Sequence, residues 1–397
     1  MRRLTHLLAA STAAAVILGG SLASGRAQAS APATTGVTKN QILIGTSLPQ
    51  SGLAASYGVI AGGEQAYFDY INAKGGIYGR KLKLIALDDN YDPTRTLANV
   101  RNLVQSRNVF ALIGVLGTAN NLAIQSFLTQ QKVPLVMPLT GSTGVIQPLR
   151  KYTFTYQPSY TVEAKALVDY AVKTLHAQKI GVFYQDDEFG QEGLKAATDE
   201  AVKLGASLGA SAQYSLTDLD MSNQVQNMQQ AGVDAVIMFS IPTATGFFLG
   251  AAAKAGFQTH FLSSSVGGDP TILKALGPAA DGVYFTDWLP DWAQAKETAL
   301  YRQILAKYGN SKTAPVGPST EGGMAAAQIL VEGIKRAGKN LTRSGLVTAL
   351  ESLHHWNGGI APNVNYSSSK HDGPEGVYIA QSHNAILTPV TGYVYPQ

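Results

Sequence analysis

The stretch Gly114–Ile124, GVLGTANNLAI, decides how the middle of this chain folds. It has the pattern of a buried β-strand that stops at a glycine and continues directly into a helix. In α/β proteins such a junction turns backbone N–H groups and the positive end of the helix dipole outward, where they hold polar or anionic ligands. The stretch therefore predicts a ligand-binding edge of a parallel sheet.

Apolar runs with strand character alternate with amphipathic helical windows along the chain. The first series has predicted strands at 41–48, 81–87, 109–116, 133–138 and 152–156, with helices at 62–73, 94–105 and 120–131. The second has strands at 179–184, 207–214, 235–240 and 261–264, with helices at 160–175, 190–204, 222–231 and 245–255. Two such series predict an α/β protein with two Rossmann-like parallel-sheet lobes, each covered by helices on both faces. A helical pair at 298–307 and 321–337 precedes a tail predicted to be irregular from His354 onward.

The N-terminus has the order of a secretory signal. Two arginines are followed by an uncharged run over 4–25 and by the small-residue end AQA. We expect a signal peptide over 1–29 that is cleaved after Ala29, and a flexible lead-in over 30–40. An uncleaved membrane anchor is the alternative, but the many Ala, Ser, Thr and Gly residues disfavour it. The paired arginines leave open whether export uses the general or the twin-arginine route.

Composition narrows the class of protein further. The chain has no cysteine, so an exported form has neither disulfides nor a cysteine to carry a lipid. We therefore expect a free, monomeric protein of the periplasm. Removing the signal removes three arginines and no acids, which leaves 27 basic and 26 acidic residues. This balance and the 14% charged fraction give no reason to expect a nucleic-acid partner.

Motifs for chemistry are weak in this sequence. GASLG at 205–209 matches the nucleophile motif G-x-S-x-G, but a predicted helix precedes it and a strand follows, which is the reverse of the required order. Histidines 354, 355, 371 and 383 lack the spacing of a zinc site. No dinucleotide fingerprint follows the first strand, and no P-loop motif occurs. We predict a protein that is not an enzyme and has no metal or cofactor.

Polar loops follow the carboxyl ends of the predicted strands, where parallel sheets bind ligands. They are SGLAASY (51–57), GTAN (117–120), LTGST (139–143), DDEF (186–189), SIPT (240–243) and SSSVG (263–267). Taken singly, each is explained equally well by turn and helix-capping chemistry. Together, with Tyr57 and Phe189, they predict a cleft that holds a small polar molecule by hydrogen bonds and aromatic packing.

Six stretches resemble type I periplasmic binding proteins of the leucine/isoleucine/valine-binding branch, the substrate-binding components of branched-chain amino acid ABC transporters. They are ILIGTSLPQSGLAASYG (42–58), INAKGGIYGRKLKLIALDDNYDP (71–93), ALIGVLGTAN (111–120), VPLVMPLTGS (133–142), KIGVFYQDDEFGQEGL (179–194) and LTRSGLVTALESL (341–353). The resemblance covers the whole mature chain, and INAKGGIYGRKL followed by a strand is its most specific part.

This resemblance implies a fold and a function. Two lobes would be joined by a three-crossover hinge near 157–160, 284–288 and 358–364. Lobe 1 would hold 41–157 plus 288–360, and lobe 2 would hold 158–287 plus 361–397. The protein would capture an amino acid, an organic or aromatic acid, or an amide by hinge closure and deliver it to a membrane permease. A periplasmic ligand sensor that feeds a signalling partner is the alternative, although no output domain is visible.

The resemblance also implies site residues. In amino-acid binders the ligand carboxylate is held by hydroxyls and backbone N–H groups that match the GTAN and LTGST loops, and aromatics matching Tyr57 and Phe189 pack on the ligand. Two positions depart from that pattern, because Ser265 replaces the glutamate that pairs with the ligand ammonium and Ile241 replaces a tyrosine. Gln157 replaces an arginine of the acid-binding branch, and Asp187, Asp287 or Glu321 could hold the ligand instead. The predicted ligand-binding set is Tyr57, Gly117, Thr118, Leu139, Thr140, Gly141, Ser142, Gln157, Tyr160, Phe189, Ile241, Ser265 and Asp287.

Overall fold

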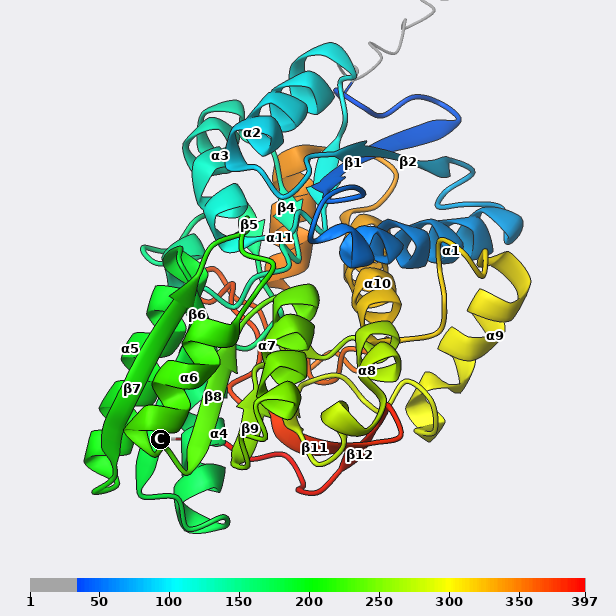
Figure 1. Cartoon of the computed structure of the whole chain (residues 1–397). Coiled ribbons are helices and arrows are strands. Elements are labelled where there is room, and N and C mark those ends of the chain that lie inside the picture. The colour runs from blue at the N-terminus through cyan, green and yellow to red at the C-terminus, as the bar shows by residue number, and fades with distance from the viewer. Residues whose placement is uncertain (1–33, 397) are drawn as a thin grey trace, which may run out of the picture. The chain divides into compact units, whose positions relative to one another are not determined.

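The computed structural model describes residues 34–396 (Figure 1). The predicted signal peptide and residues 30–33 of the predicted lead-in lie outside the described residues. In the described part of the lead-in, Val37 forms a β-bridge with Ile42. The Leu43 N–H also donates a hydrogen bond to the Gly36 carbonyl. This turn therefore adds to the start of the first strand.

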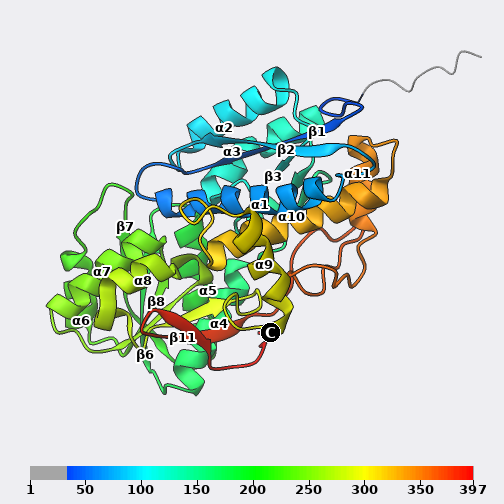
Figure 2. The same cartoon turned by 90° about the vertical axis from the view of Figure 1, so that its right-hand side faces the viewer.

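The first sheet has five parallel strands in the order β2-β1-β3-β4-β5. They are β1 Gln41–Leu48, β2 Lys81–Asp88, β3 Ala111–Ile113, β4 Leu135–Val136 and β5 Thr153–Phe154. Helices α2 (Pro93–Arg101) and α3 (Thr118–Gln131) cover one face, and α1 (Val59–Ala73) and α10 (Pro318–Ala337) cover the other (Figures 1 and 2). Helix α9 (Ala299–Tyr308) packs on α1, and α11 (Arg343–Glu351) packs on α10. We call these elements the first lobe.

The second sheet has seven strands in the order β12-β11-β10-β9-β8-β6-β7. They are β6 Lys179–Gln185, β7 Ser207–Tyr214, β8 Ala235–Phe239, β9 His260–Ser263, β10 Tyr284–Asp287, β11 Tyr378–His383 and β12 Ile386–Pro389. Helices α4 (Tyr160–Lys173) and α5 (Glu188–Lys203) cover one face. Helices α6 (Ser222–Ala231), α7 (Pro242–Lys254) and α8 (Pro270–Leu276) cover the other (Figure 1). These elements form the second lobe.

The chain passes between the two sheets three times, and this confirms the predicted two-lobe α/β fold with three crossovers. It leaves the first sheet after β5 and returns after β10, since α10 packs on β3 and β4. It then re-enters the second sheet at β11. The residue boundaries given for the lobes stay a prediction.

Several sequence predictions need correction. The tail after His354 is not irregular throughout, because β11 pairs antiparallel with β10, and β12 with β11. The second sheet is therefore mixed rather than parallel. The predicted strand 109–116 has only three residues in β3, and the helix predicted at 94–105 divides into α2 and a π-helical turn over Asn102–Ser106. Helix α3 begins at Thr118, two residues earlier than predicted.

Close packing of α1 against α10 holds the first lobe together. A Cβ built on Gly63 would lie 2.1 Å from the Thr320 carbonyl oxygen, and one built on Gly323 would lie 2.1 Å from that of Ile60. Such distances are far below any van der Waals contact, so only glycine allows the two backbones to approach this closely. The buried side chains of both helices join one large hydrophobic core under the first sheet.

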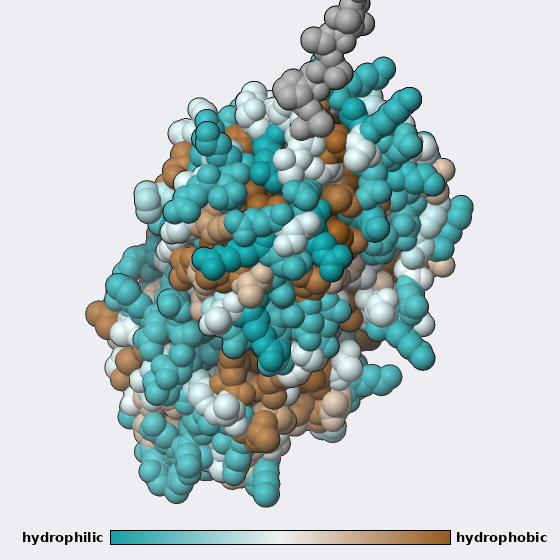
Figure 3. Space-filling model, turned by 90° about the horizontal axis from the view of Figure 1, so that it is seen from above, coloured by the Kyte–Doolittle hydropathy of each residue, from teal (hydrophilic) through white to brown (hydrophobic). Residues whose placement is uncertain are grey.

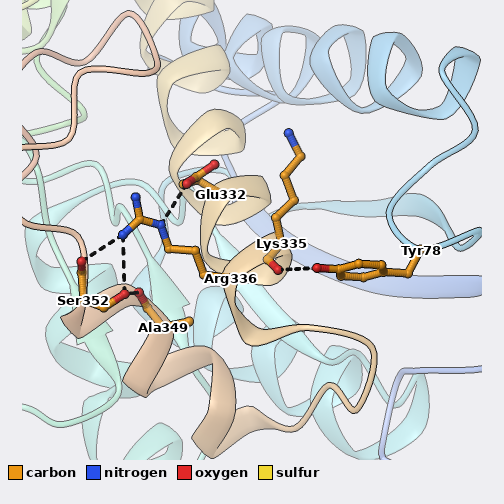
Figure 4. Close-up of polar contacts among 6 residues, drawn as sticks. All are labelled: Tyr78, Glu332, Lys335, Arg336, Ala349 and Ser352. Carbon is orange, nitrogen blue, oxygen red and sulfur yellow. Dashed lines mark hydrogen bonds and ion pairs between the residues drawn. The ribbon is translucent and has the colours of Figure 1, made fainter.

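The C-terminal end of α10 is fixed by hydrogen bonds to its carbonyl groups and to α11 (Figure 4). The Tyr78 hydroxyl donates to the Lys335 carbonyl at 2.7 Å. Arg336 pairs with Glu332 at 2.8 Å and donates to the Ser352 carbonyl at 2.9 Å. These contacts satisfy carbonyls that a helix end leaves without a partner. They also connect α10 to the end of α11.

The surface seen in Figure 3 is polar over most of its area, with small apolar patches between the polar side chains. Within the part of the chain that the structure describes, no helix is both long enough and apolar enough to pass through a membrane.

Candidate ligand-binding site

A cavity of about 100 Å³ lies between the two lobes. Loops that follow β1, β3 and β4 of the first sheet meet loops that follow β6, β9 and β10 of the second sheet there. Since one water needs about 10–15 Å³ measured in this way, the cavity has room for roughly seven to ten water-sized groups. That is the size of a small metabolite.

The cavity brings together eight of the thirteen predicted residues: Tyr57, Gly117, Leu139, Gln157, Tyr160, Phe189, Ser265 and Asp287. Five others do not line it: Thr118, Thr140, Gly141, Ser142 and Ile241. Sequence reasoning gave no individual binding role to several lining residues, among them Tyr91, Thr286, Trp288 and Ser319. Trp288 directly follows β10, a strand that the sequence pattern did not reveal. Tyr91 lies in the turn after β2 with a φ of 61°, and the sequence pattern of strand ends does not predict this left-handed backbone conformation.

The resemblance assigned the GTAN and LTGST loops to the ligand carboxylate. In the structure the hydroxyls of these loops hydrogen-bond within the protein. The hydroxyl oxygens of Thr118 and Thr140 lie 2.8 Å apart, and each residue is 1% exposed. The Thr140 hydroxyl also accepts a bond from the Ser142 N–H. A Cβ on Gly141 would lie 2.9 Å from the Tyr160 ring, so this aromatic side chain packs directly over the loop. A role for these groups in binding stays a prediction, although Thr118, Thr140 and Ser142 are not among the residues that line the cavity.

Ile241 is fully buried, and its N–H donates to the Tyr214 hydroxyl at 3.0 Å. A tyrosine hydroxyl is therefore present beside this position, supplied by β7 instead of by residue 241 itself. Asp187 caps α5 by accepting from the Gly190 N–H at 3.1 Å. This is the helix-start role expected for a carboxylate at that place.

Aromatic rings form much of the cavity wall. They come from Tyr57, Tyr91, Tyr160, Phe189, Phe285 and Trp288. The Tyr160 and Phe189 ring centroids are 4.7 Å apart, a typical separation for a favourable pair. Burial raises the pKa of the Tyr57 and Tyr91 hydroxyls well above the ordinary value, so both stay neutral. The wall thus offers large π-faces and no phenolate charge.

Trp288 separates this cavity from a second hollow, which lies toward the C-terminal tail. Tyr156, Tyr393 and Tyr395 line that hollow together with Trp288. Trp288 as a whole is only 7% exposed. It therefore forms a thin partition with a recess on each side.

Position 265 contains no acid, but a carboxylate lies next to it. Glu163, in the first turn of α4, accepts from the Ser265 N–H at 2.7 Å and from the Ser265 hydroxyl at 3.1 Å. The Thr286 hydroxyl donates to the same carboxylate at 2.5 Å. Burial raises the pKa of Glu163, while these hydrogen bonds and one from Gln157 lower it. Glu163 lies only six residues after Gln157, yet nothing in the sequence linked it to Ser265.

Asp287 is the only residue with an ionisable carboxyl among the described residues that line the cavity, and no Lys, Arg or His lines it. One of its oxygens accepts from the N–H groups of Trp288 at 2.7 Å and Leu289 at 3.3 Å. Burial raises the pKa of Asp287 from 3.8 to about 6, although these hydrogen bonds lower it. The third alternative acid, Glu321, is 1% exposed and does not line the cavity.

Three of the hydrogen bonds that connect the lobes join segments far apart in the chain. The Tyr57 hydroxyl donates to the Val266 carbonyl at 2.7 Å. Thr243, at the start of α7, donates to the Leu53 carbonyl at 2.9 Å. On the α5 side, the Thr143 N–H donates to Glu192 at 3.1 Å. Each bond joins a first-lobe loop to a second-lobe helix or loop, so the structure shows the lobes in contact across the cleft.

Residues considered for catalysis lie away from this cavity. Ser207 begins β7, and its hydroxyl donates to the Gln178 carbonyl at 3.3 Å. The described residues include no group of three or more His, Asp or Glu side chains placed to hold a metal ion. Buried His371 stacks on Phe154 with ring centroids 3.9 Å apart.

A family model described as periplasmic binding protein matches residues 41–385. The chain belongs to this family. Leu/Ile/Val-binding protein homolog 8 of Brucella abortus is 25% identical over 285 residues, which are 68% of this chain and 70% of that protein. The Leu/Ile/Val-binding protein of Escherichia coli is 26% identical over 59% of this chain and 64% of its own length. The resemblance predicted from the sequence is thereby confirmed.

Solved structures have the same fold. A possible leucine/isoleucine/valine-binding protein from Rhodopirellula baltica is similar with a TM-score of 0.81 and 24% identity, over 89% of this chain and 96% of that one. A branched chain amino acid ABC transporter structure from Thermus thermophilus, with bound valine, is similar with a TM-score of 0.83 and 21% identity, over 90% of this chain and 97% of that one. This likeness shows that the two-lobe fold is shared.

Proposed function

We propose that this protein is a periplasmic solute-binding protein that captures one small solute between its lobes and delivers it to the permease of an ABC importer. The observation that carries the proposal is the cavity between the lobes at the carboxyl ends of the parallel strands, the position where α/β folds bind ligands. The names of the Escherichia coli relative and of the valine-bound Thermus thermophilus structure support a solute of amino-acid size.

Hinge closure is part of this proposal. The three interlobe hydrogen bonds would break when the lobes separate to admit the solute. A bound solute touches both lobes and so favours the closed state by its differential affinity. Residues 1–29 would direct the chain to the periplasm and would be removed there.

Thermal unfolding of the mature chain in the presence of candidate solutes tests the proposal. A solute that binds only the folded state adds about 2.7 kcal/mol of stability at a hundredfold excess over its Kd. We expect a panel of amino acids, amines, amides and short-chain acids to contain at least one such solute. Phe189→Ala removes a cavity wall and should abolish the response, whereas Ser207→Ala, on the far strand β7, should retain it. Chemical turnover of the stabilising solute, or no response to the whole panel, would refute the proposal.

A further inference from the structure

The charge of the cavity wall restricts what it can hold. Asp287 is the one charged side chain among the described residues that line it, and no cationic side chain faces it. An anionic solute would have to leave water and lie near this carboxylate without a cationic side chain to balance its charge. Transferring an unpaired charge into a closed site is strongly unfavourable. A cationic solute meets a ready partner instead.

A second carboxylate strengthens the same preference. Glu163 lies directly behind Ser265 and Thr286, two residues of the wall, and hydrogen-bonds to both. It is fully buried and makes no cavity contact, so it acts on the cavity only through its electric field. Opposite charges attract more strongly in a poorly solvated interior than in water. Glu163 and Asp287 therefore act together on whatever enters.

The remaining wall suits the same kind of solute. Six aromatic residues line the space, and ring faces attract cations through their quadrupole. The first-lobe hydroxyls that could have received a ligand carboxylate, those of Thr118 and Thr140, hydrogen-bond to each other under Tyr160 and do not line the cavity. The wall thus combines features that favour a positive charge with a lack of side chains that favour a negative one.

We propose that the cavity selects a small organic cation, an alkyl amine or alkylammonium compound without a carboxylate, whose charge lies beside Asp287 and whose apolar body lies against the aromatic rings. This ligand class rests on the function proposed above, because it concerns the same cavity.

The test uses four probes with the same branched alkyl body and different charge: isopentylamine, leucine, 4-methylpentanamide and 4-methylpentanoate. Their binding to the mature chain, refolded after denaturation to remove carried-over ligand, is measured by isothermal titration calorimetry. We expect isopentylamine to bind most tightly and 4-methylpentanoate most weakly. Asp287→Asn should weaken isopentylamine binding by about thirtyfold or more, the loss typical of a removed charge partner. Asp287→Glu, which keeps the charge, should restore part of it.

Glu321→Gln is the matched control, since Glu321 is a buried carboxyl near Asp287 that does not line the cavity and, unlike Glu163, hydrogen-bonds to no described residue of the cavity wall, while burial raises its pKa well above the ordinary value and so favours the neutral form. It should leave the affinity for isopentylamine unchanged. Tighter binding of leucine or 4-methylpentanoate than of isopentylamine would overturn the cation inference and leave the solute-binding function standing. An unchanged affinity in a folded Asp287→Asn protein would do the same. The probe ranking needs no variant, so a variant that fails to fold does not remove the test. If neither these probes nor the wider solute panel binds, the proposed function itself is wrong.

Discussion

Replacing Asp287 with asparagine should stabilise the ligand-free protein at pH 8. Burial raises the pKa of Asp287 from 3.8 to about 6, so its pKa in the folded state is about two pH units above that in the unfolded state. One unit corresponds to about 1.4 kcal/mol, which puts the cost of ionising Asp287 in the fold at about 3 kcal/mol at most. Asparagine avoids this cost and still offers an oxygen to the N–H groups of Trp288 and Leu289. Because those bonds lose their charge assistance, we expect a net gain of about 1–2 kcal/mol.

The sign of the pH dependence provides the sharper check. Since the folded-state pKa is the higher one, the wild-type contribution is most favourable below pH 3.8 and is lost as pH rises toward 6. The stability difference between variant and wild type should therefore grow across that window and level off above it. Glu163 and Glu321 also have raised pKa values, so only the difference between the two proteins isolates Asp287.

Urea unfolding of both ligand-free proteins at pH 4 and pH 8, followed by far-UV circular dichroism, measures this difference. A variant that is equally or less stable at pH 8, or a difference that does not change with pH, would refute the reasoning. If both predictions for Asp287→Asn hold, this one substitution stabilises the ligand-free fold and weakens the binding of a cationic solute. Such a trade-off is common where a binding site stores unfavourable electrostatics.

Three further predictions follow from single contacts. Tyr57→Phe removes an interlobe hydrogen bond. Calorimetry should show solute binding about fivefold weaker, which corresponds to about 1 kcal/mol. An unchanged Kd would mean that this bond does not favour closure. Gly63→Ala places a Cβ against the Thr320 carbonyl and should lower the free energy of unfolding, measured in urea, by about 1–3 kcal/mol or more. As the control, Gly322→Ala places a Cβ that meets nothing within 4 Å and should not lower it. Glu64 is fully buried with neither oxygen hydrogen-bonded, and burial raises its pKa well above the ordinary value. Keeping this carboxyl protonated costs stability once the pH exceeds the unfolded-state pKa of 4.5, so Glu64→Gln should raise the free energy of unfolding at pH 7 and change it little at pH 4. Urea unfolding at both pH values measures this, and a loss of stability at pH 7 would contradict it.

The sequence predicted the parallel part of the fold closely, because those elements are defined by local patterns. Strands β1 and β7 and helix α6 have the predicted bounds. Runs of apolar residues and amphipathic periodicity are local features, so they predict an element without information about distant segments. The antiparallel strands of the tail were missed for the opposite reason. Tyr378–His383 becomes a strand through its pairing with β10, whose residues lie about ninety positions earlier in the chain. Pairing over such a separation leaves no local signal.

The site was predictable as a set of loops but not atom by atom. The loops after β3, β4, β6 and β9 do converge, because parallel topology places strand ends at one edge. Which hydroxyl faces the cavity depends on packing, and Tyr160 over Gly141 turns the Thr140 loop inward. The carboxylate beside Ser265 belongs to Glu163 of α4, about one hundred residues earlier in the chain. Comparing residue 265 alone with the family pattern therefore shows a missing acid, although a carboxylate lies next to that residue in the structure.

The partition formed by Trp288 has an optical consequence. The chain has three tryptophans, and neither Trp292 nor Trp356 lines the cavity. An indole between two recesses changes its emission when the polarity on one side changes, so solute entry should alter the fluorescence of one defined residue. Trp288→Tyr should remove that change and leave the emission of the other two indoles. With the proposed function, Trp288 would serve as a label-free reporter of cavity occupancy.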